Sequence, residues 1–248
     1  MDIFLILIAA FGAGVLNTIA GGGTFLTFPA LVFIGVPPVV ANATSAVAVF
    51  PGYLGGALGF RDELGRFDKA LIKRLTLVTL AGGLVGSLLL LVSSNAAFSV
   101  VVPFLLLGAT LAFLFGDQIR AWAAHKSRTV TPYGSASLFL VSMYGGYFNG
   151  GLGIVLLALF SLWGMSNIHE MNGLKIWLSF ALSAISVTVF ALGGLVEWHY
   201  AIGMMIAATL GGYAGAPVSR MLSKSVVRGV IASVGFSMSA VFFWRLFG

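Results

Sequence analysis

The residues most able to do chemistry in this sequence gather around one lysine. Lys175 shares its region with amide side chains and glycines, namely Asn149, Gly150, Gly151, Gly153 and Asn172. A lysine inside a bilayer costs about 2.5–3.5 kcal/mol on insertion scales, so a favourable interaction should offset its charge. Either the Lys175 ammonium binds an anion, or it extends along its helix to the membrane surface. We expect an anion site here, with the second reading as the alternative.

A second set of similar residues precedes the first by roughly 130 positions. It comprises Asn17, Gly21, Gly22, Gly23, Thr24, Asn42, Thr44 and Ser45. Consecutive glycines break a helix and leave free N–H groups at the start of the next one, where the helix dipole is positive. Such a terminus favours anions. The asparagines could donate hydrogen bonds to an anion or cap the helix ends, and both roles stay open.

Other reactive side chains are sparse. His169 and Glu170 are candidates to relay a proton, since histidine titrates near pH 6.5. The alternative is that they end a helix at the aqueous surface. The sequence has no cysteine and no phosphate-binding loop, and its three histidines are scattered. We therefore expect no enzyme activity, no cofactor and no metal site.

Composition indicates that these residues lie in a membrane. Of the 248 residues, 59% are hydrophobic and only 8% are charged, where soluble proteins carry roughly 25%. So few charges could not cover the surface of a soluble fold, whereas lipid is itself an apolar solvent. The net charge of +6 is attributed to cytoplasmic loops and not to nucleic-acid binding.

Apolar runs divide the chain into ten expected helical segments. They are 3–20, 24–36, 40–60, 70–92, 96–115, 132–148, 152–163, 171–196, 200–222 and 226–247. Crossing a core of about 30 Å takes roughly 20 helical residues. The second and seventh segments are shorter, and each follows a glycine cluster. They are expected to be half-helices in re-entrant or broken pairs.

The short segments occupy matching places in two halves. The expected organisation is a first transmembrane repeat (1–116), a cytoplasmic linker (117–131) and a second transmembrane repeat (132–248). Gly82-Gly83-x-x-Gly86 in the first half matches Gly211-Gly212-x-x-Gly215 in the second, and both are interpreted as helix-packing motifs. Each repeat would hold a broken helix pair and three spanning helices, in an all-α polytopic membrane protein.

Charge placement predicts that the two halves have opposite orientation. Lysines and arginines collect in loops after the third, fifth and ninth segments, which should be cytoplasmic. Both termini should then be external, although Arg245 near the C-terminus does not fit. Inverted repeats with broken helices are typical of secondary transporters.

The paired motifs resemble a known family. Gly12-x-Gly14-x-x-Asn17-x-x-Ala20-Gly21-Gly22-Gly23-Thr24, with Ala41-Asn42-Ala43-Thr44-Ser45, resembles the first repeat of the sulfite exporter TauE/SafE family, also called the 4-toluene sulfonate uptake permease family. Gly145-Gly146-x-x-Asn149-Gly150-Gly151-x-Gly153, with Asn172-Gly173-x-Lys175, fits the second repeat. The resemblance implies transport of sulfite, sulfoacetate or other organosulfonates. The second repeat departs from the first at Lys175, which corresponds to Ser45.

The expected function is therefore a multi-pass secondary transporter of small sulfur-containing anions in the cytoplasmic (inner) membrane, working by alternating access. The anion would be held at the glycine-rich helix breaks. The alternatives are an anion channel, or a membrane enzyme or assembly factor without transport activity. The partners expected are the anion and the lipid bilayer, with no nucleic acid, and a homodimer is compatible with the sequence.

Overall fold

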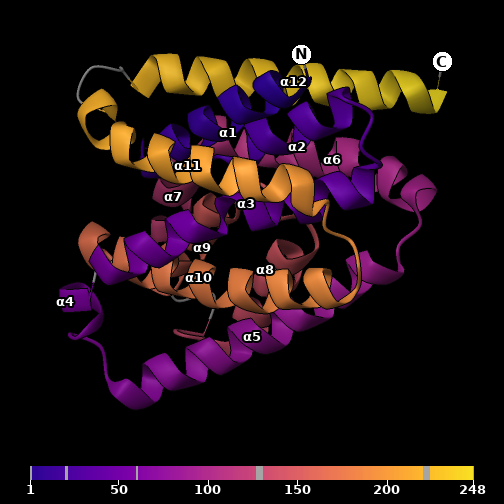
Figure 1. Cartoon of the computed structure of the whole chain (residues 1–248). Coiled ribbons are helices and arrows are strands. Elements are labelled where there is room, and N and C mark those ends of the chain that lie inside the picture. The colour runs from indigo at the N-terminus through magenta and orange to yellow at the C-terminus, as the bar shows by residue number, and fades with distance from the viewer. Residues whose placement is uncertain (1, 20–21, 60, 127–130, 220–223, 248) are drawn as a thin grey trace.

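The protein is a bundle of helices (Figure 1). The computed structural model describes residues 2–19, 22–59, 61–126, 131–219 and 224–247. The helices are α1 (Asp2–Ile19), α2 (Thr24–Phe33), α3 (Pro38–Gly59), α4 (Arg61–Leu64), α5 (Lys69–Val92), α6 (Asn95–Leu114), α7 (Gly116–His125), α8 (Ser135–Phe148), α9 (Leu152–Leu162), α10 (Ile168–Leu192), α11 (Trp198–Ser219) and α12 (Lys224–Phe247). The described residues contain no strand.

The described residues include four helices that are long and apolar enough to cross a membrane. These are α5, α6, α10 and the Gly229–Phe247 part of α12. Among the shorter apolar helices, α2 has 10 residues and α9 has 11. At 1.5 Å per residue each extends about 15 Å, half the thickness of a bilayer core. The expectation of two undersized apolar segments is confirmed.

The short helices follow breaks that glycine makes possible. Gly151 has φ +72°, a left-handed conformation that residues with a Cβ rarely adopt, and it precedes the first residue of α9. At the other break Gly22 and Gly23 precede α2. Gly21 lies outside the described residues. Among the described residues, glycine thus precedes the start of each short helix without adding a side chain there.

Two close helix crossings hold the bundle together. Helix α1 packs most extensively on α11, and α5 packs most extensively on α8. A Cβ at Gly82 would lie 2.6 Å from the Phe139 carbonyl oxygen and 2.7 Å from Ser142 Cβ. A Cβ at Gly211 would lie still closer to the Phe11 carbonyl oxygen in the α1–α11 crossing. The interpretation of these glycines as packing residues is therefore confirmed, because only a missing Cβ allows the backbones to approach this far.

Other contacts also join helices of the two halves of the chain. Helix α10 packs on α3 and α5, α11 packs on α3, and α12 packs on α6. A hydrogen bond links α6 and α12, because the Ser239 hydroxyl donates to the Pro103 carbonyl oxygen at 2.7 Å. In Figure 1, α4 and the start of α12 lie at the left end of the molecule, and the α5–α6 and α10–α11 connections lie at the right end.

Some boundaries differ from those expected. The stretch 117–131, expected as a linker, contains most of the amphipathic helix α7, whose buried Ala123 faces the protein. Helix α10 begins at Ile168, three residues earlier than expected, because the Asn167 side chain caps its first turn. It ends at Leu192, before Gly194 with φ +69°. Hydrophobicity alone does not reveal a cap or a surface helix.

Candidate functional site

The second helix break brings the predicted lysine to the start of a half-helix. Helix α8 ends at Phe148, Asn149 caps it, and α9 starts at Leu152. A methyl group at Gly153, in the first turn of α9, would lie 3.4 Å from Lys175 Cδ. The lysine side chain therefore runs along the N-terminal turn of α9. This is the N-terminal end of that helix, where the helix dipole favours negative charge, although the Leu152 and Ile154 N–H groups donate to the Asn149 and Gly151 carbonyl oxygens.

The Lys175 ammonium has a neutral partner. Its Nζ donates to Asn172 Oδ1 at 2.9 Å, and the side chain is partly buried. None of the ion pairs found among the described residues includes Lys175. The positive charge is thus held by an amide and left without a carboxylate. Lys175, Asn172 and the Gly150–Gly153 break come together, as the sequence analysis expected.

The first break is closed by an asparagine. Asn17 Oδ1 accepts a hydrogen bond from Gly23 N–H at 2.8 Å, so Asn17 caps the start of α2. This hydrogen bond fits the capping role considered for Asn17, and anion binding stays a proposal. Thr24 follows as a buried first residue of α2. One turn later the Thr27 and Ser45 hydroxyls lie 2.6 Å apart, which ties α2 to α3.

The two breaks lie against the same turn of one helix. A methyl group at Gly22 would lie 3.7 Å from the Phe113 ring, and one at Gly151 would lie 3.1 Å from Ala109 Cβ. Ala109 and Phe113 are four residues apart on α6 and share a face, about 6 Å apart along its axis. The starts of α2 and α9 therefore both lie beside the last two turns of α6.

The remaining predicted residues divide into two groups. Asn42 Nδ2 donates to the Tyr147 carbonyl oxygen at 2.9 Å, which places it at the last turn of α8 beside the second break. Asn149 is buried, with the Tyr53 hydroxyl against its side chain. Thr44 instead accepts from Glu197 N–H at 3.0 Å and ties α3 to the start of α11. Thr44 thus has a structural partner outside the breaks.

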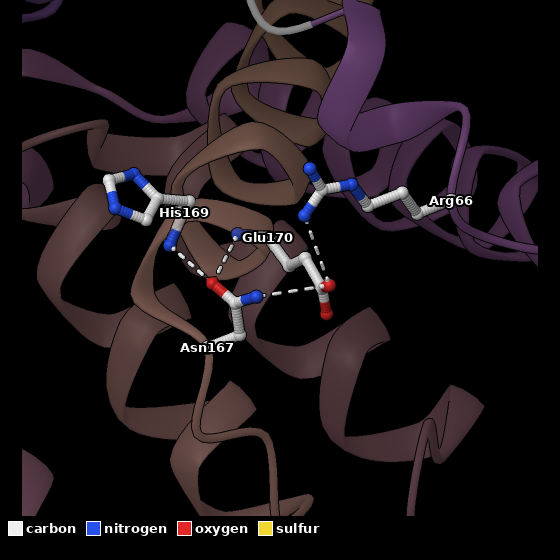
Figure 2. A network of polar contacts seen from close by, with 4 residues as sticks. All are labelled: Arg66, Asn167, His169 and Glu170. Atoms are coloured by element: carbon white, nitrogen blue, oxygen red, sulfur yellow. Dashed lines mark hydrogen bonds and ion pairs between the residues drawn. The ribbon is translucent and has the colours of Figure 1, made fainter.

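His169 and Glu170 lie at the end of the molecule and not at its centre. Asn167 Oδ1 accepts from the backbone N–H groups of both residues, and Asn167 Nδ2 donates to Glu170 Oε1 at 3.1 Å (Figure 2). Arg66 approaches Glu170 Oε1 at 3.8 Å. This arrangement resembles a capping box, with an acidic side chain in the first helical turn. The geometry fits the helix-end alternative for this pair.

Several residues near the breaks were not singled out from the sequence. The Tyr144 hydroxyl donates to the Gly150 carbonyl oxygen. Phe28 of α2 and Phe148 of α8 pack edge to face, with ring centroids 5.9 Å apart, and bring these two helices into contact. In the sequence, only their position could have indicated these three aromatic residues, because each lies within about two helical turns of a glycine break. In a chain with 21 phenylalanines that signal is weak.

The described residues contain no group of three or more histidine, aspartate or glutamate side chains that could hold a metal ion.

Comparisons with known proteins agree with this architecture. A family model described as Sulfite exporter TauE/SafE matches residues 6–242. A probable membrane transporter protein of Haemophilus influenzae is 29% identical over 97% of this chain and 96% of its own length. The probable membrane transporter protein YfcA of Escherichia coli K12 is 26% identical over 92% of this chain and 84% of its own length. No solved structure matches the chain.

Proposed function

Because the chain belongs to the sulfite exporter TauE/SafE family of multi-pass membrane transporters, we propose that it carries small sulfur-containing anions by secondary transport. Sulfite, sulfoacetate and other organosulfonates are the candidate substrates. They share a compact group of oxygens around sulfur with delocalised negative charge. Such a group can accept several hydrogen bonds at once, which suits a helix N-terminus.

Lys175 is the observation that carries this proposal. Its side chain lies along the first turn of α9, where a methyl group at Gly153 would be 3.4 Å from Lys175 Cδ. Its ammonium is bound to the neutral Asn172 amide, so a positive charge is available without a resident counter-ion among the described residues. An anion at the α9 N-terminus would gain both the lysine charge and the helix dipole.

The packing supports an alternating-access mechanism between two inverted repeats. The α1–α11 contact has its counterpart in α8–α5, and the α3–α11 contact has its counterpart in α10–α5. The α3–α10 and α6–α12 contacts each join corresponding helices of the two halves. A bundle with this pairing has two equivalent arrangements, which is the requirement for opening a central site to either side. The charged loops favour external termini in the cytoplasmic membrane.

Flux measurements test the proposal directly. The purified protein is reconstituted in liposomes, and uptake of sulfite, sulfoacetate, sulfate, thiosulfate and a carboxylate is measured. We expect uptake of at least one sulfur-containing anion. Lys175→Ala should lower that uptake about ten-fold or more, since a charge-assisted hydrogen bond contributes about 1.5–3 kcal/mol.

Lys73 supplies the matched control. It is exposed near the start of α5, away from both breaks, and Lys73→Ala should transport at the wild-type rate. Normal uptake by Lys175→Ala would remove that residue from the site. Absence of uptake for every anion tested would contradict the transporter assignment in this form.

A further inference from the structure

A second polar feature lies beside the anion site. Asn42 is only 3% exposed, and its Oδ1 accepts no hydrogen bond from any described residue. The orientation of the amide is set by its other end, because Nδ2 donates to the Tyr147 carbonyl oxygen at 2.9 Å. The unpartnered atom is therefore an acceptor. A buried acceptor requires a hydrogen-bond donor or a cation.

The second repeat indicates what kind of partner is missing. Asn172 is the counterpart of Asn42, and its Oδ1 accepts from the Lys175 ammonium at 2.9 Å. Lys175 in turn corresponds to Ser45, which has no charge. Asn172 Oδ1 thus accepts from a positively charged side chain. The equivalent atom, Asn42 Oδ1, has no hydrogen-bond partner among the described residues. The first repeat keeps the amide and lacks the cation.

The chemistry around Asn42 suits a small cation. Ser45 is three residues further along α3 and on the same face, and its hydroxyl can offer a lone pair while it bonds to Thr27. The end of α8 lies alongside, and its last carbonyls carry partial negative charge. All of these groups offer uncharged oxygen atoms, and oxygen is the ligand that hard cations prefer. Without a carboxylate, a monovalent ion suits them better than a divalent one.

We propose that a sodium ion binds between Asn42 Oδ1, the Ser45 hydroxyl and the C-terminal end of α8, at the place that corresponds to the Lys175 ammonium in the second repeat. The ion would bridge α3 of the first half and α8 of the second. Movement between the halves would change its coordination, so sodium binding would be coupled to transport. The coupling rests on the proposed function, whereas the ion site itself does not.

Direct binding of radioactive sodium to the purified protein in detergent tests the site. Wild type should bind sodium saturably, with choline as the inert replacement ion, and sodium should raise its melting temperature. Asn42→Ala should weaken binding about ten-fold or more. Ser45→Lys should abolish binding, because it adds a tethered ammonium like that of Lys175, and its melting temperature should not respond to sodium.

Asn172→Ala is the matched control, since it removes the equivalent amide from the other repeat and should bind sodium like wild type. Size-exclusion chromatography establishes that each variant is folded, and Ser45→Lys remains informative if Asn42→Ala fails to fold. Absence of saturable sodium binding by wild type would mean that water alone satisfies Asn42 and would overturn the site. Unchanged binding in folded Asn42→Ala and Ser45→Lys would also overturn it.

Anion flux separates this inference from the proposed function. In liposomes, wild-type uptake should be at least about five-fold faster with sodium than with choline. Equal uptake in the two salts would overturn the coupling and leave anion transport standing. Sodium binding without any anion uptake would support the ion site and contradict the transporter assignment.

Discussion

At the scale of single residues, the same amide side chain has different partners in the two repeats. Asn17 caps α2 by accepting from Gly23 N–H, whereas Asn149 Oδ1 has no partner among the described residues. Asn172 binds an ammonium, and its counterpart Asn42 binds a backbone carbonyl. The sequence repeat therefore predicts the positions of these asparagines but does not predict their hydrogen-bond partners. Those depend on neighbours such as Lys175 that only one repeat has.

Asn17→Asp separates capping from anion binding. The aspartate should still accept from Gly23 N–H and keep α2 capped, so the melting temperature should not fall. Its fixed negative charge at the start of α2 should repel a transported anion and lower uptake about ten-fold or more. Melting curves and liposome uptake check the two effects separately.

Asn17→Ala should lose the cap, at a cost of about 1 kcal/mol. Wild-type uptake by Asn17→Asp would exclude the α2 terminus from the anion site.

At the scale of elements, glycines determine how closely the helices approach. Gly82 lies in the α5–α8 crossing, where an added Cβ would meet the Phe139 carbonyl oxygen at 2.6 Å. Gly108 lies within α6, and a Cβ there would meet nothing within 4 Å. The two positions are both helical and differ in what surrounds them. They form a natural pair for measuring the contribution of close packing.

Gly82→Ala should destabilise the protein by about 1–3 kcal/mol, because backbone atoms cannot move aside as a flexible side chain can. Gly108→Ala should be neutral or stabilising by up to about 1 kcal/mol, since alanine favours helix and nothing obstructs it. Melting temperatures of the purified variants in one detergent provide the comparison. Equal destabilisation by both would show that helix propensity, and not the crossing, sets the effect.

Much of this element pattern could be predicted from the sequence. Long apolar runs and glycine clusters locate the spanning helices and both short ones, because those features act over local stretches of chain. Helix α7 was missed, since an amphipathic helix lacks a continuous apolar run. The candidate sodium ligands were also missed as a cation site. Neutral oxygens such as Asn42 Oδ1 have no sequence signature of their own, and a ligand set of this kind is visible only where the chain folds it together.

At the scale of the whole molecule, the inverted arrangement proposed for the two halves predicts that the α5–α6 and α9–α10 connections lie on opposite sides of the membrane. Ala96 is the second residue of α6, Ser166 lies two residues before α10, and both are exposed. The chain has no native cysteine, so a single introduced cysteine can be labelled without background. Ala96→Cys should react with a membrane-impermeant reagent in intact cells, and Ser166→Cys only after the membrane is opened. Labelling of both from the same side would contradict the inverted arrangement.

The most extensive helix contacts join one half of the chain to the other. They predict that neither half is stable alone. Helix α1 packs on α11 and α5 packs on α8, so each half buries its closest glycine crossing against the other. A fragment ending at residue 126 would leave the packing faces of α1 and α5 without partners, and one beginning at residue 131 would do the same for α8 and α11. Expressed separately, the fragments should be degraded. Expressed together, they should reassemble and restore anion uptake, as quantitative immunoblots and liposome flux would measure. Wild-type accumulation of either fragment alone would mean that each half folds independently and that these crossings contribute little.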